Sequence, residues 1–190
     1  MTDTTPISEA GQAELLRIAR AVVEAVAQGD PSPEVQSDLT ELQPPRGAFV
    51  TLHKKGQLRG CIGRFIAHEP AWQVVADMAR SAATEDPRFA PVSRAELPDV
   101  DIEISALSPM VRTADPLSLE LGRHGIYIRR GMHSGTFLPQ VATEFGMTKE
   151  QFLSQCCAHK AGLPPDAWQD PATEVYLYTA QVFAEKPDTP

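Results

Sequence analysis

The order strand, turn, strand, helix occurs twice in this sequence, at residues 48–84 and at 125–161. In each copy, two apolar stretches flank a polar turn that contains glycine, and a stretch with helical spacing follows. Strands joined by a short turn pair as an antiparallel hairpin, and a helix with an apolar stripe covers one face of it. We therefore expect an α+β protein with a mostly antiparallel sheet, covering helices, two related hairpin-and-helix halves and a smaller lobe.

The remaining elements are predicted from spacing and capping residues. Residues 8–28 have the apolar spacing of a helix, with Ser8 as N-cap and Gly29 as stop. The proline-rich stretch 30–45 predicts a connection with at most a short helix at 34–41. Strict alternation of apolar and polar residues predicts a half-buried strand at 100–107. Thr148 and Gln151 predict a capping box at the start of a helix that runs to about residue 161. The pattern near the end of the chain predicts a strand at 174–184. We expect one domain over 10–185, between flexible termini at 1–9 and 186–190.

Composition excludes several classes of protein. The chain has 190 residues, 42% of them hydrophobic and 22% charged, as in an ordinary soluble domain. A net charge of −8 disfavours nucleic-acid binding, which depends on clustered lysine and arginine. No apolar run is long enough to cross a membrane, and the first residues lack a signal-peptide pattern, so we expect a cytoplasmic protein. The three cysteines have no CxxC spacing and no nucleotide fingerprint occurs, so we expect no disulfide framework, no metal and no cofactor.

The most informative motif is Leu-Arg-Gly-Cys-Ile-Gly at 58–63, on the return strand of the first hairpin. Side chains alternate along a strand, so one face is expected to carry Leu58 and Ile62 and the other Arg59 and Cys61. A guanidinium beside a thiol favours the thiolate, which is the nucleophilic form. The motif therefore predicts a chemical site centred on Cys61.

The glycines of this motif have two interpretations. Glycine inside a strand marks a bulge or the close approach of a backbone or a ligand, so Gly60 and Gly63 are candidate substrate-binding residues. Alternatively, Cys61 is a core residue and the glycines make room for a helix, because free cysteine is among the most buried residue types. The sequence leaves both open.

Four residues outside the motif are candidates for the same site. His124 could act as general acid or base, or could hold a turn through a backbone hydrogen bond. Glu103 lies on the polar face of the strand at 100–107, where it is a candidate catalytic carboxylate or simply solvated. Asp86 and Arg88, on either side of Pro87, are candidate substrate-binding residues, although pairing with each other to brace the loop is the favoured role. His133 could meet Cys61 and His124, but no close-spaced ligand pair supports a metal site.

The order of these motifs resembles the AMMECR domain family over roughly residues 10–185. The resemblance rests on Gly47–Leu52, the hexapeptide, Ala82-Ala83 with Asp86-Pro87-Arg88-Phe89, Ile102–Ser105, Gly122 with His124-Gly125-Ile126, Leu138–Ala142 and Lys160–Leu163. Met147 departs from the tryptophan of many relatives, a change that concerns packing rather than chemistry. Bacterial members are called protein A of the AmmeMemoRadiSam system.

The resemblance implies partners but no agreed reaction. The implied partners are a Memo-type protein, similar in fold to iron-dependent extradiol dioxygenases, and a radical S-adenosylmethionine protein. Two hypotheses follow. In the first, the chain is a thiol-centred enzyme for a small organic substrate, with Cys61 as nucleophile, Arg59 favouring the thiolate or holding an anion, and His124 as acid or base. In the second, it is an adaptor that presents the hexapeptide surface to a partner. We expect Cys61, Glu103 and His124 to converge.

Overall fold

The computed structural model describes residues 6–185 and divides into two compact units. The N-terminal unit consists of residues 6–107 and 181–185, and the C-terminal unit consists of residues 108–180. Each unit contains one of the two hairpin-and-helix copies predicted from the sequence. The protein has the α+β fold that the sequence predicts, with antiparallel strand pairing in both units.

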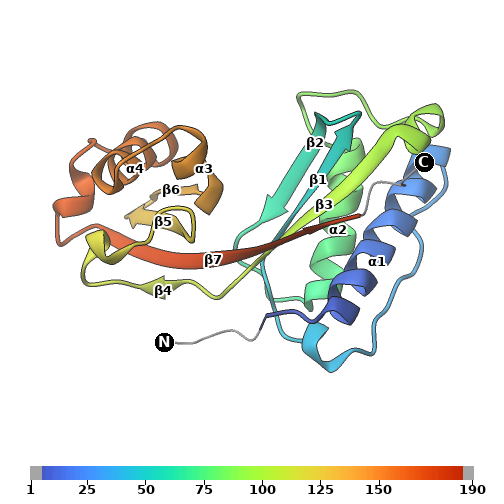
Figure 1. The fold of residues 1–190 in the computed structure, drawn as a ribbon, viewed down its shortest axis with the longest axis horizontal. Helices are drawn as coiled ribbons and strands as arrows, with labels where there is room; N and C mark the ends of the chain where they lie inside the picture. The colour runs from blue at the N-terminus through green and yellow to red at the C-terminus, as the bar shows by residue number, and fades with distance from the viewer. Residues whose placement is uncertain (1–5, 186–190) are drawn as a thin grey trace. The chain divides into compact units, whose positions relative to one another are not determined.

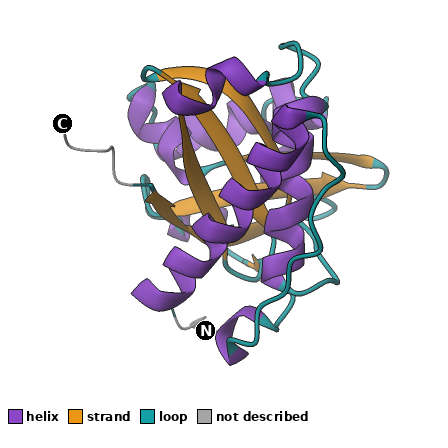
Figure 2. Cartoon of the chain, turned by 90° about the vertical axis from the view of Figure 1, so that its right-hand side faces the viewer, coloured by secondary structure: helices purple, strands orange, loops and turns teal. Residues whose placement is uncertain are grey.

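The N-terminal unit is a sheet with two helices on one of its faces. Its elements are α1 (Glu9–Gln28), β1 (Ala48–Lys54), β2 (Gln57–Arg64), α2 (Ala71–Thr84), β3 (Val100–Leu107) and the last residues of β7 (Glu174–Ala184). The strand order is β2-β1-β3, with β7 beside β3, so β2 forms an edge of the sheet. Figure 1 shows these elements, and Figure 2 shows helices in front of the strands of this unit. The short 3-10 turns η1 (Thr40–Leu42) and η2 (Arg94–Asp99) lie in its connections.

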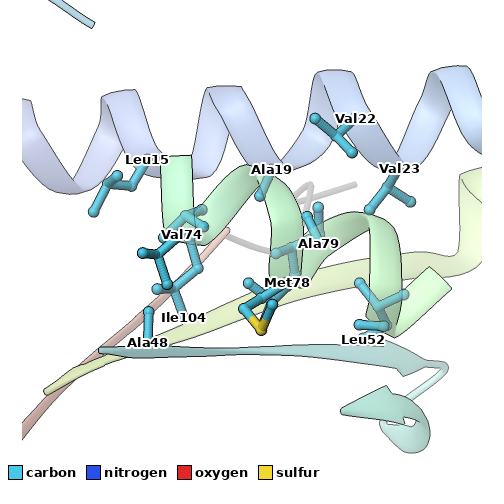
Figure 3. Packing of buried hydrophobic residues seen from close by; sticks show 14 of the residues in the cluster. Leu15, Ala19, Val22, Val23, Ala48, Leu52, Val74, Met78, Ala79 and Ile104 are labelled. Atoms are coloured by element: carbon cyan, nitrogen blue, oxygen red, sulfur yellow. The ribbon is translucent and has the colours of Figure 1, made fainter. Parts of the chain in front are cut away.

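The core of the N-terminal unit lies between these helices and the sheet. Leu15, Val74 and Leu52, from α1, α2 and β1, are fully buried, and Figure 3 shows them in one cluster. Burying a leucine or valine side chain stabilises the fold by about 1.5 to 3 kcal/mol. Because Val50 and Leu52 point to the helices, the alternate residue Thr51 points to the opposite face of the sheet.

The ends of α1 agree with the prediction. The side chain of Ser8 accepts a hydrogen bond from Gly11 N–H, and Gly29 ends the helix in the left-handed conformation, with a φ of 83°. The flexible ends expected at 1–9 and 186–190 lie partly outside the described residues. Within the described part, Ile7 is buried and its N–H donates to Gln181 at 2.8 Å, so this part of the N-terminal segment is held by the unit.

The C-terminal unit has its own sheet and core. It contains β4 (Val111–Arg112), β5 (His124–Arg130), β6 (His133–Phe137), the first residues of β7, and the 3-10 turns η3 (Pro116–Ser118) and η5 (Ala167–Gln169). β7 pairs with β4 and with β5, and β5 pairs with β6. The helices α3 (Pro139–Glu144) and α4 (Lys149–Cys156) complete the unit, and Phe137, Phe152 and Cys156 are in its core.

The predicted helix at 148–161 forms with one change of geometry. Thr148 and Gln151 make the expected capping box at the start of α4. After Cys156 the chain widens into a π-helical turn, η4 (Cys157–Ala161), and Gly162 ends it in the left-handed conformation. The short helix expected at 34–41 reduces to η1, because the proline-rich connection offers no longer regular stretch.

Candidate functional site

A β-bulge at Arg59 determines which way Cys61 points. The hairpin turn at Lys55 and Gly56 has positive φ at both residues, 52° and 76°, as a two-residue hairpin turn requires. Lys54 pairs with Gln57, so regular pairing would place Cys61 opposite the buried Val50. Instead, the register shifts between Leu52 and His53, so no residue of β1 lies opposite Arg59. Cys61 therefore lies opposite Thr51, on the face away from α1 and α2.

The bulge corrects one part of the sequence prediction. Leu58 and Ile62 were expected on one face, but Leu58 pairs with His53 and Ile62 pairs with the buried Val50. These partners point to opposite faces of the sheet, so Leu58 and Ile62 do as well. The reason is the extra residue between them, which reverses the alternation.

Cys61, Thr51 and Glu103 form a row across three strands. Thr51 pairs with Cys61 on one side and with Glu103 on the other, and residues directly opposite share a face. The Thr51 hydroxyl donates to the Cys61 sulfur, with 3.2 Å between Oγ1 and Sγ. Cys61 is partly exposed. The sheet thus brings the predicted nucleophile and the predicted carboxylate to one face, with a hydroxyl between them.

The loop after α2 holds the backbone of Cys61. Asp86 is buried, and its Oδ2 accepts the Cys61 N–H at 2.8 Å and the Arg88 guanidinium at 2.7 Å. Arg88 also donates to the Cys61 carbonyl at 3.4 Å. The hydrogen bond from Arg88, joined by that from Cys61 N–H, holds the pKa of Asp86 well below its usual range. The expected pair between Asp86 and Arg88 is therefore present, and it braces the strand that carries the thiol.

Arg59 is directed into a separate ion-pair network. Its Nε donates to Glu96 Oε1 at 3.0 Å, and Lys54 contacts the same oxygen at 2.9 Å. The hydrogen bond from Arg59 is the main reason that the pKa of Glu96 lies well below its usual range. The Phe89 ring is approached by both guanidiniums, with 5.8 Å from its centroid to Arg59 Cζ and 5.4 Å to Arg88 Cζ. The Arg59 side chain is 13% exposed, so it is mainly enclosed by protein.

The two glycines of the hexapeptide are explained by packing. A Cβ at Gly60 would clash with the carbonyl oxygen of Ala82 in α2, so this glycine makes room for a helix, as the alternative interpretation holds. A Cβ at Gly63 would clash with the ring of Phe49. Gly60 is buried opposite Leu52 on the helix side, so packing accounts for this glycine, and its role as a substrate contact stays a prediction.

His124 belongs to the C-terminal unit, at the start of β5. Its ring Nδ1 accepts a hydrogen bond from the backbone N–H of Glu120 at 2.9 Å. The backbone N–H of His124 donates to the Glu120 carbonyl, also at 2.9 Å. Burial lowers the pKa of His124, so the neutral form with its proton on Nε2 fits this turn. That tautomer offers a donor rather than a base. Cys61 and Glu103 lie in the other unit, and the convergence of His124 with them stays a prediction.

The other two thiols have a different setting. Cys156 and Cys157 are fully buried in the core of the C-terminal unit, and burial raises the pKa of both. In the part of the chain that the structure describes, no group of three or more histidine, cysteine or acidic side chains gathers as a metal site. Cys61 does not line the three cavities of about 460, 650 and 510 Å³ on the two units.

Sequence reasoning missed Thr51 and Glu96. Both carry ordinary polar side chains, and nothing in a single sequence pairs Glu96 with Arg59. Thr51 could be assigned to Cys61 only by counting residues from the turn and knowing that one residue is bulged. Ser93 and Glu96 form a capping box at the start of η2, and this pattern can be recognised in the sequence.

Fold and site together define an α+β protein with a partly exposed cysteine on the edge strand of an antiparallel sheet. Comparison with known proteins identifies the group: the AMMECR1 family model matches residues 16–183, so this chain belongs to that family. No helix among residues 6–185 is long and apolar enough to cross a membrane.

Relatives are found among archaeal proteins. A protein of Methanothermobacter thermautotrophicus is 43% identical over 95% of this chain and 97% of its own length. A protein of Nanoarchaeum equitans is 42% identical over 90% of this chain and 98% of its own length. The crystal structure of the uncharacterized protein PH0010 from Pyrococcus horikoshii is similar, with a TM-score of 0.79, 38% identity and 90% of each chain covered.

Proposed function

We propose that this protein is protein A of the AmmeMemoRadiSam system, acts in the cytoplasm, and uses Cys61 as the nucleophile of a thiol-centred enzyme. The observation that supports this best is the setting of the sulfur. It is partly exposed and accepts a hydrogen bond from the Thr51 hydroxyl, which stabilises a thiolate more than a thiol. Cys156 and Cys157, by contrast, are enclosed and held as thiols by burial.

The chemistry would be addition of the thiol to a small organic electrophile. The sulfur lone pair forms the bond to an electrophilic carbonyl carbon, the carbonyl π pair moves to oxygen, and the thiol proton passes to a base. Glu103 is the carboxylate on the same face, one strand beyond Thr51. His124, with Nδ1 occupied by Glu120 N–H, keeps Nε2–H as a donor, which suits the role of general acid rather than general base.

Arg88 is better placed than Arg59 to contact the substrate. Its side chain is 53% exposed and donates to the Cys61 carbonyl, whereas the Arg59 side chain is 13% exposed and paired with Glu96. A guanidinium binds carboxylates through parallel hydrogen bonds. In this proposal Arg88 recognises an anionic group of the substrate, and Arg59 supports the bulge that turns Cys61 outward.

The adaptor hypothesis has one observation in its favour. Cys61 lines none of the three cavities described above, and enzymes usually bind small molecules in concave sites. In this alternative, the face around Cys61, with the exposed Leu58 nearby on the same strand, presents a surface to another protein. The family resemblance supplies the partners for either alternative, a Memo-type protein and a radical S-adenosylmethionine protein.

A gene-replacement experiment separates the two alternatives. In a strain that lacks the gene, the small molecules that accumulate are identified by mass spectrometry, and each variant is tested for restoring the normal profile. The enzyme proposal expects Cys61→Ser to fold, to retain capture of a Memo-type partner and to fail to restore the profile. Thr51→Ser, which keeps the hydroxyl, is the matched control and should restore it. Restoration of the profile by Cys61→Ser would refute the enzyme proposal and favour the adaptor.

A further inference from the structure

The C-terminal unit contains a cavity that is independent of the Cys61 site. Its volume is about 650 Å³, within the range of small-molecule sites in proteins, about 300 to 1,000 Å³. The walls come from the end of β4 and the chain after it, on one side, and from η5 and the loop before β7, on the other. The Thr113 N–H donates to the Val175 carbonyl at 2.9 Å, so the two sides are joined by backbone hydrogen bonding.

One part of the lining is apolar and fixed in position. Trp168, Pro116, Pro171 and Val175 contribute to it. The Trp168 indole N–H donates to Ser154 Oγ at 3.0 Å, which sets the orientation of the ring. Two prolines restrict the backbone on both sides of the cavity. Flat, rigid apolar groups of this kind suit a ring-shaped ligand, which they contact with little loss of side-chain entropy.

The charged residues of the lining are Arg112 and Asp170, and both belong to an ion-pair network with residues outside the cavity. Arg112 contacts Glu174 at 3.3 Å, but the same carboxylate binds Arg129 more closely, at 2.6 Å. Asp170, which also lines the cavity, is paired with Arg130 at 3.1 Å. This ion-pair network therefore contains three guanidiniums and two carboxylates, those of Arg112, Arg129, Arg130, Glu174 and Asp170. Arg112 is half-exposed and has the longest of these contacts, so it is the cation most available to an anion.

Thr173 carries an enclosed hydroxyl beside the cavity. It lines the cavity, is 7% exposed, and its hydroxyl oxygen has no hydrogen-bond partner among the residues that the structure describes. Its backbone is fixed, because Thr173 N–H donates to the Asp170 carbonyl at 2.8 Å. A buried hydroxyl without a partner destabilises the fold, whereas valine in its place fills the same space without that cost. A ligand in the cavity could restore the bond after rotation about the Thr173 Cα–Cβ bond.

We infer that this cavity binds a small carboxylic acid with a flat apolar ring. The carboxylate pairs with Arg112 through charge-assisted hydrogen bonds, and the ring packs on Trp168 and the prolines. The Thr173 hydroxyl bonds to the carboxylate or to a polar substituent of the ring. Recognition of this kind needs no metal and no residue of the hexapeptide, so the site stands apart from the proposed function of Cys61.

Benzoate is the probe that tests this inference, and benzamide is its neutral counterpart. The protein has two tryptophans, so Trp72→Phe leaves Trp168 as the only indole reporter. Benzoate should change the Trp168 fluorescence saturably, with a Kd on the order of 1 mM for so small a molecule, and benzamide should bind at least about fivefold more weakly. Arg112→Gln should weaken benzoate binding about tenfold, and Thr173→Val about fivefold.

The control is Arg123→Gln, which removes one positive charge from the same unit. Arg123 is exposed and pairs with Glu120, outside the network around the cavity, so this variant should bind benzoate as the parent does. Thr173→Val should also raise the melting temperature without ligand, because it removes an unpaired buried hydroxyl. Absence of a saturable Trp168 response, equal binding by the Arg112→Gln and Arg123→Gln variants, or a lower melting temperature for Thr173→Val would each overturn the inference.

Discussion

The Cys61 N–H donates to Asp86 Oδ2 at 2.8 Å on the outer edge of the sheet. Because Arg88 also bonds to the Cys61 carbonyl, both backbone groups of the cysteine are occupied by the loop after α2. An edge strand normally leaves such groups free for pairing with another strand. At the thiol, this edge is therefore closed to strand addition, and a substrate or partner has to approach Cys61 through its side chain.

Asp86→Asn should destabilise the protein by about 2 kcal/mol, because it removes a buried charge that accepts several hydrogen bonds. The pKa of Asp86 is lowered in the folded state, so its contribution to stability is present above the unfolded value of about 3.9 and is lost as pH falls below it. Urea unfolding at pH 7 and at pH 3 measures both effects.

The Asp86→Asn variant should lose less stability than the parent between those two pH values. Part of the pH dependence of stability should remain in the variant, because the pKa of Glu96 is also lowered, mainly by its hydrogen bond with Arg59. Equal pH dependence of the parent and the variant would show that Asp86 is not held as a carboxylate by Cys61 and Arg88.

Limited alkylation of the native protein at neutral pH should label Cys61 first. It is partly exposed, whereas Cys156 and Cys157 are fully buried with a raised pKa. Peptide mapping by mass spectrometry identifies the labelled residue, and unfolding in denaturant should make all three react. Labelling of Cys156 or Cys157 before Cys61 would contradict the thiol-centred proposal.

Thr51→Val should slow alkylation of Cys61 at neutral pH about two- to threefold. The Thr51 hydroxyl donates a hydrogen bond to the sulfur, and losing a bond worth about 1 kcal/mol leaves the charge on the reacting sulfur less well stabilised. Thr51→Ser retains the hydroxyl and should react at the parental rate. An unchanged rate for Thr51→Val would mean that the hydroxyl does not stabilise the thiolate.

Arg59→Lys should cost about 1 to 3 kcal/mol of stability although it keeps the charge. Lysine lacks the planar fork that places Nε and Nη2 on Glu96, and Lys54 already contacts that carboxylate. Arg59→Met should cost at least as much. Thermal unfolding measures both, and restoration of the small-molecule profile in the deletion strain should follow the folded fraction. A stable Arg59→Lys protein that fails to restore the profile would instead assign Arg59 to the chemistry.

Much of the fold could be predicted because local signals and burial agree. The strand at 100–107 has the predicted bounds, since every second residue from Val100 to Ala106 is buried in the core. α1 begins and ends at the residues that Ser8 and Gly29 predict, because a cap fixes a helix end locally. The same holds for the capping box of α4. These elements need no information from distant parts of the chain.

The site could be predicted less well, because its geometry depends on distant contacts. Gly60 is glycine because Ala82, on a helix that begins after the hairpin, approaches its Cα, and this contact cannot be read from the hexapeptide. The partner of Arg59 is Glu96, which is 37 residues away, and the capping box that Glu96 forms with Ser93 gives no sign of this contact. Asp86 and Arg88 could be paired in advance because only two positions separate them, but their hold on Cys61 could not.

The bulge at Arg59 reverses the alternation of side chains along the second strand of the hairpin. Between the turn and the bulge, the even-numbered residues of β2 point away from the helices. Beyond the bulge, the odd-numbered residues do. Regular pairing of the same residues, without the bulge, would place Cys61 opposite Val50 and turn its side chain toward α2, where Val50 and Leu52 are enclosed. A shift of the pairing by one residue, with no change in the cysteine itself, would thus convert an accessible thiol into a core thiol. Chemical access to Cys61 is in this sense a property of how β2 pairs with β1.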